Sequence, residues 1–587
     1  MVDVPEHSAE SREPGSRARG PAWWFQAATA VLLIAGVAGR VSFLAWDDRW
    51  GPHHADEATL VPQGLAMWEG VTPRDVGWPA STMRIALSAG AGMQWLGERG
   101  YEAWQRRRDP PVTLELVSNW IATRLADRQP LYKLGRFTAL LIGVTQLLVL
   151  VWALRRWLGP PGVLAGLGVI SLGYLPVAFS QFVLADIAGL LFATLVVGLA
   201  ARPTDRSIVM MGAMAGLAAA SKFHFGLWLL APIVASWSRS AGKGRPGWRS
   251  ALASTGMCFW VIVTLVPWLW LDPTLALKEL TGEVFLRIGA GASGRDMLKH
   301  AGTIALSLGP LGFAGALLAL LALTKSSGRR LAPVMLPTAL GAAALTGSSV
   351  FFDRYVLVLL PGVAVLAGLG WEYCLGHRTR FVRVATGVGL VASLLLMTVN
   401  LGASQRAIGA THVDVLAARW VMQYVPPGAV VAVHDETVAP LPRTAEQLRA
   451  CVARVTTSEA YRQKWSILGW GVDPDGPEPM RSMLLNDERY FAYLCRRELE
   501  VRSESEGYRV VLFHNGPRFW AVEEADAMTR FRSDTVAEPA RIDVLILSQE
   551  VDLGLEPIEI VRSPVGQRII YVRPGLALVG SGGRPIP

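Results

Sequence analysis

The run AWWFQAATAVLLIAGVAGRVSFLA, residues 22–45, decides the class of fold. A helix needs about 20 predominantly apolar residues to cross a bilayer, and this run supplies them. It is too long for the apolar core of a signal peptide and lacks a convincing cleavage site, so we predict a helix that stays in the membrane. The polar tail before it, residues 1–21, carries Arg17 and Arg19 near its end, which predicts a cytoplasmic N-terminus.

The composition of the whole chain indicates a polytopic membrane protein of the cell membrane. Of its 587 residues, 51% are hydrophobic and only 18% are charged, and 22 are Trp, a balance that soluble domains do not have. The formal net charge of +9 could indicate a nucleic-acid partner. However, the Lys and Arg residues lie in short clusters between apolar runs, where the positive-inside rule places them. We therefore expect no nucleic-acid partner.

Apolar runs and basic clusters predict about eleven membrane-spanning helices within residues 22–402. Residues 46–130 are expected to form a large external loop in which 80–96 lies along the membrane surface as a helix. The odd number of crossings places the C-terminus outside. The predicted spans are 22–45, 134–152, 163–179, 187–200, two short helices within 208–237, 251–271, 304–323, 334–350, 356–374 and 384–401.

Residues 403–587 have the composition of a soluble domain, predicted to be an extracytoplasmic α/β domain. A helix is expected from Thr411 to Tyr424, with an apolar face that ends before Pro426. Short β-rich runs interleaved with helical stretches favour a mixed sheet. The predicted strands are Val430–Val433, Arg509–Phe513, Val544–Leu547 and Ile569–Val572. Four Cys and no CxxC pair indicate neither a disulfide framework nor a zinc site, and whether Cys451 and Cys495 pair is left open.

Two adjacent carboxylates follow the first predicted helix in the stretch HHADEATL, residues 53–60. Carboxylates at a membrane boundary are costly to desolvate, so Asp56 and Glu57 are candidates for function. If the substrate is a sugar carried on a lipid phosphate, the site needs a general base and positive charge for the departing phosphate. Asp56 could be the base. Lys222, His224 and Arg354, all predicted on the same external side, are the candidates for binding the phosphate.

Several short motifs resemble GT-C glycosyltransferases of the protein O-mannosyltransferase and aminoarabinose-transferase type. The first is the Asp-Glu pair that opens the external loop, and the others follow in the expected order and topology. They are Trp78-Pro79, Gly135-Arg136-Phe137, Ala185-Asp186, Ala220-Ser221-Lys222-Phe223 and Asp353-Arg354-Tyr355. The resemblance covers most of residues 22–400, and it does not extend to the C-terminal domain.

The resemblance implies an inverting hexosyl or pentosyl transfer from a polyprenyl-phosphate sugar to an acceptor hydroxyl on the extracytoplasmic side. Asp56 would be the catalytic carboxylate, Glu57 would support it, and Asp186 would be a second acidic residue at the same site. The sugar and the acceptor, which could be a lipid, a glycan or a protein, are left open. Membrane lipid surrounds the protein in any case.

Each of these residues also has a plainer interpretation. Asp56 and Glu57 could be a solvated loop pair, Asp186 could cap its helix, and Lys222 and Arg354 could reach toward the membrane surface as snorkelling side chains. His53 and His54 could bind a divalent metal together with one of the carboxylates, although two adjacent His need not face one centre. His434-Asp435-Glu436, after a predicted strand, favours a polar loop over a ligand site.

Two other classes of function remain open. A secondary transporter or lipid flippase could use the same charges to line a substrate path, although the sequence lacks the paired repeats that such proteins often show. A non-enzymatic envelope assembly protein would bind through its C-terminal domain and would not depend on Asp56.

Overall fold

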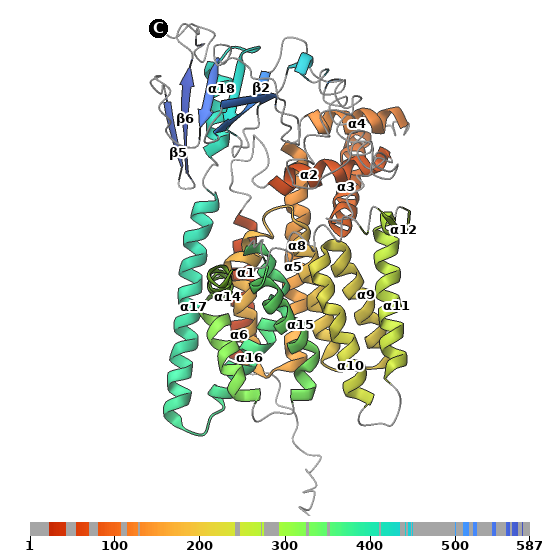
Figure 1. Cartoon of the computed structure of the whole chain (residues 1–587), viewed down its shortest axis with the longest axis vertical. Coiled ribbons are helices and arrows are strands. Elements are labelled where there is room, and N and C mark those ends of the chain that lie inside the picture. Colours follow the sequence, from red (N-terminus) through yellow and green to blue (C-terminus); the bar gives the residue numbers. More distant parts are fainter. Residues whose placement is uncertain are drawn as a thin grey trace, which may run out of the picture.

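The computed structural model is a bundle of helices with a small sheet domain at one end (Figure 1). It describes residues 23–42, 55–69, 80–106, 114–126, 129–240, 247–271, 293–323, 328–348, 353–409, 413–434, 509–515, 520–524, 543–547, 559–563 and 566–572, with a few isolated positions besides.

The chain is a polytopic helical membrane protein. By length and hydropathy, 5 of the described helices can cross a membrane, and the segments concerned are Trp23–Val41, Pro130–Trp157, Trp248–Leu265, Gly294–Leu323 and Arg380–Arg406. Shorter apolar helices accompany them at Pro160–Ser171, Ala185–Ala200, Arg330–Thr346 and Leu360–Leu375. Each predicted span falls largely on described helix, while the predicted number of about eleven crossings stays a prediction.

The labelled elements of the bundle follow the chain in alternating directions. They are α1 (Trp23–Val41), α5 (Gln129–Trp157), α6 (Pro160–Ser171), α7 (Tyr174–Ala178), α8 (Ala185–Ala200), α9 (Asp205–Ser221), η3 (Phe223–Leu229), α10 (Leu230–Ser240), α11 (Trp248–Leu265), α12 (Trp268–Leu271), α14 (Gly294–Leu323), α15 (Gly328–Thr346), η5 (Asp353–Val358), α16 (Leu360–Leu375) and α17 (Arg380–Gly409).

Two of these helices depart from straight spans for local chemical reasons. The predicted interruption at residues 221–224 is present, because α9 ends at Ser221 and Lys222 adopts an extended backbone before η3 begins. The predicted span 304–323 belongs to the longer α14, which is kinked at Gly309 (φ 66°, ψ 172°). Gly tolerates this positive φ and the following Pro310 lacks a backbone N–H, so the helix changes direction there.

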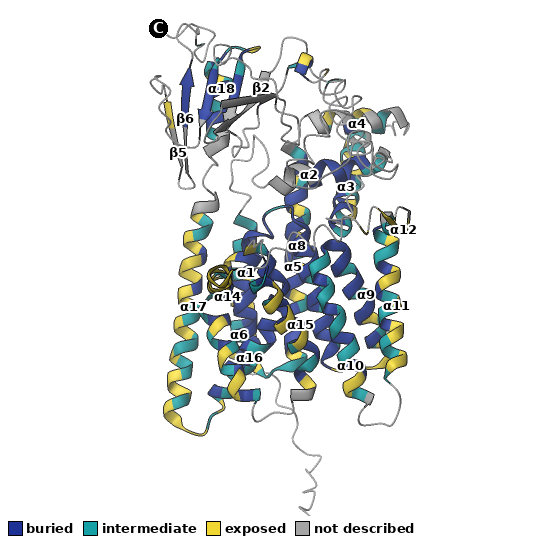
Figure 2. Ribbon diagram, viewed as in Figure 1, coloured by how far each residue is buried: buried dark blue, intermediate teal, exposed yellow. Residues whose placement is uncertain are grey.

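The core of the bundle is formed by α6, α8, α9 and α16, which are largely buried, whereas α17 and the outer face of α11 expose hydrophobic side chains (Figure 2). Exposed apolar faces of this kind suit helices that border lipid. Small residues let the central helices approach closely. A Cβ added at Gly368 of α16 would lie 2.4 Å from the carbonyl oxygen of Gly162 in α6.

Replacing Gly368 with Ala is therefore expected to destabilise the bundle by about 1–3 kcal/mol, because backbone atoms must shift to admit the methyl group. The loss would appear as a lower melting temperature of the purified protein in detergent. Gly256→Ala in α11 is the matched control, since a Cβ there has nothing within 4 Å. Equal melting temperatures for the two variants would contradict the packing of α6 on α16.

The segment between α1 and α5 forms helices at the same end of the bundle as the sheet (Figure 1). It contains α2 (Ala55–Ala66), η2 (Met67–Glu69), α3 (Ser81–Arg106) and α4 (Leu114–Ala126). The helix expected at 80–96 is thus present, although it begins at Ser81 and continues to Arg106. Met83, Leu87 and Ala91 form its buried stripe.

The C-terminal domain is a mixed six-stranded sheet in the order β3-β2-β1-β4-β6-β5. The central strand β1 (Val430–His434) runs parallel to β2 (Arg509–Asn515) and β4 (Val544–Leu547), and the outer pairings are antiparallel. The remaining strands are β3 (Trp520–Glu524), β5 (Glu559–Ser563) and β6 (Gly566–Val572). The four predicted strands are present, and β3 and β5 were not predicted.

Helix α18 (Val413–Tyr424) closes the core of this domain. Its buried Ala417 and Val421 pack with Val431, Val544 and Ile570 of the sheet. Cys451 and Cys495 lie outside the described residues, while Cys258 and Cys374 of the bundle are buried free thiols. The boundary at residue 402 stays a prediction, because α17 continues to Gly409 before α18 begins.

Candidate active site

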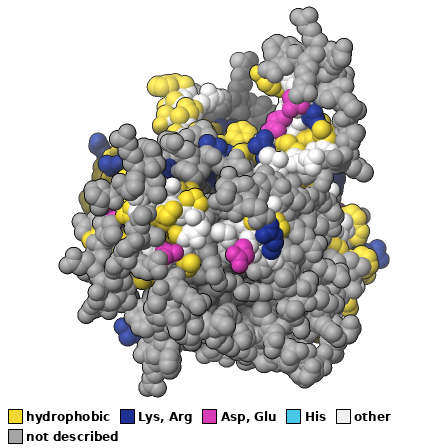
Figure 3. Space-filling model, turned by 90° about the horizontal axis from the view of Figure 1, so that it is seen from above, with side chains coloured by type: hydrophobic (Ala, Val, Ile, Leu, Met, Phe, Trp, Pro, Cys, Tyr) yellow, Lys and Arg dark blue, Asp and Glu magenta, His cyan; other side chains and the backbone are white. Residues whose placement is uncertain are grey.

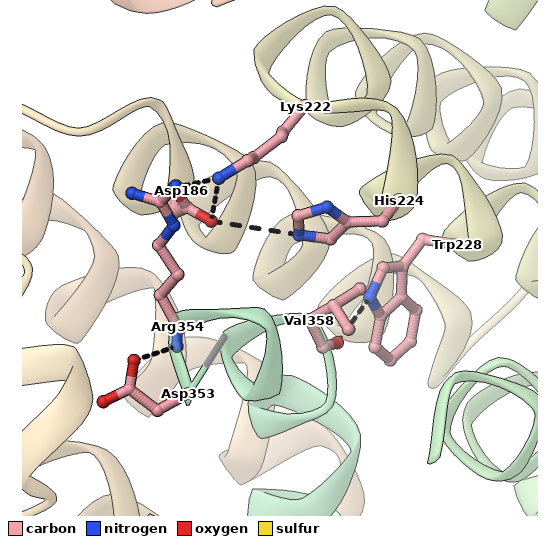
Figure 4. A network of polar contacts seen from close by, with 7 residues as sticks. All are labelled: Asp186, Lys222, His224, Trp228, Asp353, Arg354 and Val358. Carbon is pink, nitrogen blue, oxygen red and sulfur yellow. Dashed lines mark hydrogen bonds and ion pairs between the residues drawn. The ribbon is translucent and has the colours of Figure 1, made fainter. Parts of the chain in front are cut away.

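The site is built around Asp186, a fully buried carboxylate in the first turn of α8. Leu184 occupies the N-cap position, and no side chain caps this helix. The carboxylate instead accepts two hydrogen bonds from Lys222 Nζ, at 3.0 Å to Oδ1 and 2.8 Å to Oδ2 (Figure 4). Asp186 therefore forms a buried ion pair, and the interpretation of it as a helix cap is not supported.

Lys222 reaches Asp186 because the chain leaves helical geometry at this residue. Its backbone is extended (φ −162°, ψ 128°) between α9 and η3, and its N–H still bonds the carbonyl oxygen of Ala218 at 3.0 Å. The ammonium nitrogen lies 5.2 Å from the ring centroid of Tyr355, a cation–π distance. The snorkelling interpretation of Lys222 thus does not fit, because the side chain is turned inward and buried.

His224 completes the same side of the site. Its Nε2 lies 3.9 Å from Asp186 Oδ1, and its ring stacks on Phe225 with a centroid distance of 4.8 Å. The edge of the ring meets Tyr355 at 5.2 Å. Two aromatic rings therefore fix the imidazole in the orientation that faces the carboxylate.

Arg354 approaches from η5, which belongs to a distant part of the chain, and its side chain points toward Asp186 (Figure 4). Its backbone N–H donates to Asp353 Oδ1 at 2.7 Å, so Asp353 orders the start of η5. Trp228 of η3 donates from Nε1 to the carbonyl oxygen of Val358 at 3.0 Å. This bond ties η3 to η5 and holds the two cation-bearing turns together.

The charge balance of the site is positive. One carboxylate, Asp186, is surrounded by the cations Lys222 and Arg354 and by an imidazole that can also be protonated. Burial alone would disfavour the ionised carboxylate, but adjacent cations and two hydrogen bonds stabilise it. A carboxylate so stabilised is a weak base. The group is better suited to positioning cations than to removing a proton.

The Asp56-Glu57 pair lies on the first turn of α2, a described helix, while the side chains of these two residues and all of His53 and His54 lie outside the described part. Two contacts bring α2 near the site. Val61 of α2 and Val183, which precedes α8, both face Gly135 of α5, within 3.0 Å of the place of a Cβ. The carboxylate pair is thus carried by a helix that packs close to the start of α8.

A second connection runs through α3. Thr82 and Ser221 share a hydrogen bond of 2.5 Å, which joins the start of α3 to the residue before Lys222. The buried Arg84 donates from Nε to Oε1 of the buried Gln63 in α2 at 2.7 Å. The helices α2 and α3 are therefore fixed to each other and to the turn that carries Lys222.

The sequence singled out Asp186, Lys222, His224 and Arg354, and the structure brings all four together. It did not assign roles to Tyr355 or to the Arg84–Gln63 pair. A signal existed for Arg84, since a charged residue inside an apolar run indicates an internal partner. The role of Tyr355 depends on side-chain geometry that spacing does not reveal. Among the described residues, no group of three or more His, Cys, Asp or Glu could hold a metal ion.

Comparison with known proteins gives matches at the level of structure. No family model matches the chain, and no curated protein matches it in sequence. ArnT from Cupriavidus metallidurans bound to undecaprenyl phosphate is 13% identical, with a TM-score of 0.44, and the match covers 94% of this chain and 99% of that one. AglB from Archaeoglobus fulgidus, in complex with an inhibitory peptide and a dolichol-phosphate, is 12% identical, with a TM-score of 0.44 over 68% of this chain and 58% of that one.

ArnT is an aminoarabinose transferase and AglB an oligosaccharyltransferase, both GT-C glycosyltransferases, the group that the sequence motifs resemble. At these identities and TM-scores the matches assign no role to any residue of this chain. Its function has to be derived from the site formed by Asp186, Lys222, His224 and Arg354.

Proposed function

We propose that this protein is a membrane glycosyltransferase that moves a sugar from a polyprenyl-phosphate donor to an acceptor hydroxyl on the extracytoplasmic side. The observation that carries the proposal is the buried, positively charged site in which Asp186 holds Lys222 while Arg354 and His224 face the same carboxylate. Such a surplus of fixed positive charge suits an anion that gains charge during a reaction.

A lipid phosphate meets this requirement. When a sugar leaves a phosphodiester, the phosphate becomes a monoester with additional negative charge, and preorganised cations stabilise that charge as it develops. The ion pair with Asp186 keeps Lys222 oriented, so little rearrangement is needed during the reaction. In this assignment Asp186 is a positioning residue, and Lys222, Arg354 and His224 contact the phosphate.

The transfer then needs a base that is not tied to cations in this way, and Asp56 on α2 is assigned that role, with Glu57 beside it. The acceptor oxygen attacks the anomeric carbon while the bond from that carbon to the phosphate oxygen breaks. The acceptor proton passes to the Asp56 carboxylate, and polyprenyl phosphate leaves with the bond electrons. A single displacement of this kind inverts the anomeric configuration.

The assignment of the external side rests on the distribution of basic residues. Arg155 and Arg156 end α5, Arg239 lies in the last turn of α10, and Arg380 begins α17. These helix ends lie opposite the end that holds α2, α3 and the sheet (Figure 1). The positive-inside rule therefore supports a cytoplasmic end at these arginines and an extracytoplasmic location for the site and the sheet.

The function can be tested with purified protein and a panel of radiolabelled undecaprenyl-phosphate and dolichyl-phosphate sugars, with total envelope extract as acceptor. Arg354→Gln is expected to raise the KM for the active donor about tenfold to a hundredfold, because it removes a charge-assisted contact to phosphate. Arg383→Gln, an exposed arginine at the opposite end of the bundle, is the matched control and should leave this KM unchanged. Absence of transfer and of donor hydrolysis with every donor would refute the proposal.

A further inference from the structure

A cluster of indole rings and polar side chains on the external helices has no part in the mechanism above. We call it the indole cluster, and it consists of Trp68 of η2, Gln94, Trp95 and Glu98 of α3, and Trp120 and Arg124 of α4. The rings of Trp68 and Trp120 are stacked with a centroid distance of 6.2 Å, and Trp95 meets Trp68 edge-on at 6.4 Å. Trp68 and Trp120 are only half-buried.

Glu98 holds the indole cluster in one arrangement. Its carboxylate accepts hydrogen bonds from Gln94 Nε2 at 2.8 Å, from Trp120 Nε1 at 2.7 Å and from Arg124 Nη2 at 2.6 Å. On the other side, Trp68 Nε1 donates to Ser88 Oγ at 2.8 Å. The half-exposed rings are therefore fixed before any ligand arrives, which lowers the entropy cost of binding.

The indole cluster also contains polar atoms that have no partner among the described residues. These atoms are the indole N–H of Trp95, the side-chain carbonyl oxygen of Gln94 and Nε of Arg124. Buried polar groups without partners are costly and rare in folded proteins. Gln94 and Arg124 are half-buried as residues, so a change of rotamer is enough to bring their free atoms to the surface.

The ligand that fits both observations is a carbohydrate. The C–H groups on one face of a sugar ring pack on an aromatic ring, while its hydroxyls both donate and accept hydrogen bonds. The indole cluster offers aromatic rings together with two free donors and one free acceptor. A purely apolar ligand would leave these polar atoms unpaired, and Glu98 makes the cluster unfavourable for a second anion such as phosphate.

The position of the indole cluster relates it to the candidate active site. Helix α3 begins beside the turn of Lys222, through the Thr82–Ser221 bond, and Trp95 lies further along the same helix. At 1.5 Å per residue, these two points are about 20 Å apart. Seen from above, this end of the molecule presents acidic and basic side chains next to hydrophobic ones (Figure 3). A chain of several sugars can reach from one place to the other.

We propose that the indole cluster binds the carbohydrate part of the acceptor, which makes the acceptor a glycan. The inference rests on the proposed function, since it names the acceptor of that transfer. Sugars distant from the attacking hydroxyl would stack on Trp120 and bond the free atoms of Gln94 and Arg124. Binding there would hold the acceptor end near α2 and Lys222.

The test is titration calorimetry of the purified protein in detergent with linear hexasaccharides of mannose, glucose, galactose and arabinose. At least one is expected to bind the wild type. Trp120→Ala is expected to weaken that binding about tenfold or more, because the stacking surface is lost. Trp120→Phe keeps an aromatic face and should retain most of the affinity. Trp237→Ala, which removes an exposed Trp of α10, is the control and should bind as the wild type does.

Kinetics separate this inference from the proposed function. With an active donor, Trp120→Ala should raise the KM for the glycan acceptor and leave the KM for the donor unchanged, whereas a general loss of structure would lower kcat and the melting temperature together. No hexasaccharide binding to a protein that turns over the donor, or equal affinity of wild type and Trp120→Ala, would overturn the inference alone. Trp120-dependent glycan binding without any donor turnover would overturn the proposed function alone.

Discussion

Lys222→Met is expected to abolish glycosyl transfer and also to destabilise the protein. The substitution removes the cation assigned to the leaving phosphate, and the loss of one such electrostatic contact typically lowers kcat by about 10²–10³-fold. It also leaves the carboxylate of Asp186 buried without its counter-ion, which costs about 3–5 kcal/mol. The measurements are the rate of donor turnover and the melting temperature of the purified variant.

A double variant separates the two effects. Asp186→Asn combined with Lys222→Met replaces the buried ion pair by neutral groups, so the melting temperature should return toward that of the wild type. Transfer should not return, because the charge for the phosphate is still missing. Recovery of turnover in the stable double variant would show that the pair has only a structural role.

Glu372→Gln is the matched control for this experiment. Glu372 is another partly buried carboxylate of the bundle, and it accepts a hydrogen bond from the backbone N–H of Gly159 at 2.8 Å. Gln can accept the same bond, and the position lies in α16 near the start of α6, at the end of the bundle away from the site (Figure 1). Its turnover and melting temperature should match those of the wild type.

The sequence could predict the helices of the bundle because the membrane imposes a simple rule on it. Each span must be apolar and helical, and basic clusters mark one end. The break at Lys222 was also predictable, since SKFH interrupts a long apolar run. In contrast, the edge strands Trp520–Glu524 and Glu559–Ser563 have too few apolar residues to stand out. Their pairing is decided by neighbouring strands that are distant in sequence.

The composition of the site could be predicted only as a set of residues on one side of the membrane. Topology places Asp186 and Lys222 at the same end of α8 and α9, but it does not state that their side chains meet. That contact depends on the extended backbone of Lys222, and the approach of Arg354 depends on the short helix η5. The orientation of His224 between Phe225 and Tyr355 likewise follows from side-chain packing that a single sequence does not encode legibly.

Asp56→Asn is expected to lower the rate of transfer by about 10²–10⁴-fold, the range in which general bases contribute. Asn is similar in shape to Asp, and the position lies on the first turn of α2, away from the buried contacts of Val61 and Gln63. The melting temperature and the KM for the donor should therefore change little. This result would differ from that of Lys222→Met, in which turnover and stability fall together.

The pH dependence gives the sharper test of Asp56. A carboxylate acts as a base only when ionised, so the wild-type rate should fall at acid pH as the base becomes protonated. The residual activity of Asp56→Asn should lack this acid limb, whereas Glu57→Gln should keep it, because Glu57 is assigned a supporting role. An acid limb that persists in Asp56→Asn and disappears in Glu57→Gln would transfer the role of base to Glu57. Its loss only in Asp186→Asn would identify the buried carboxylate, despite its cationic partners, as the group that takes the proton.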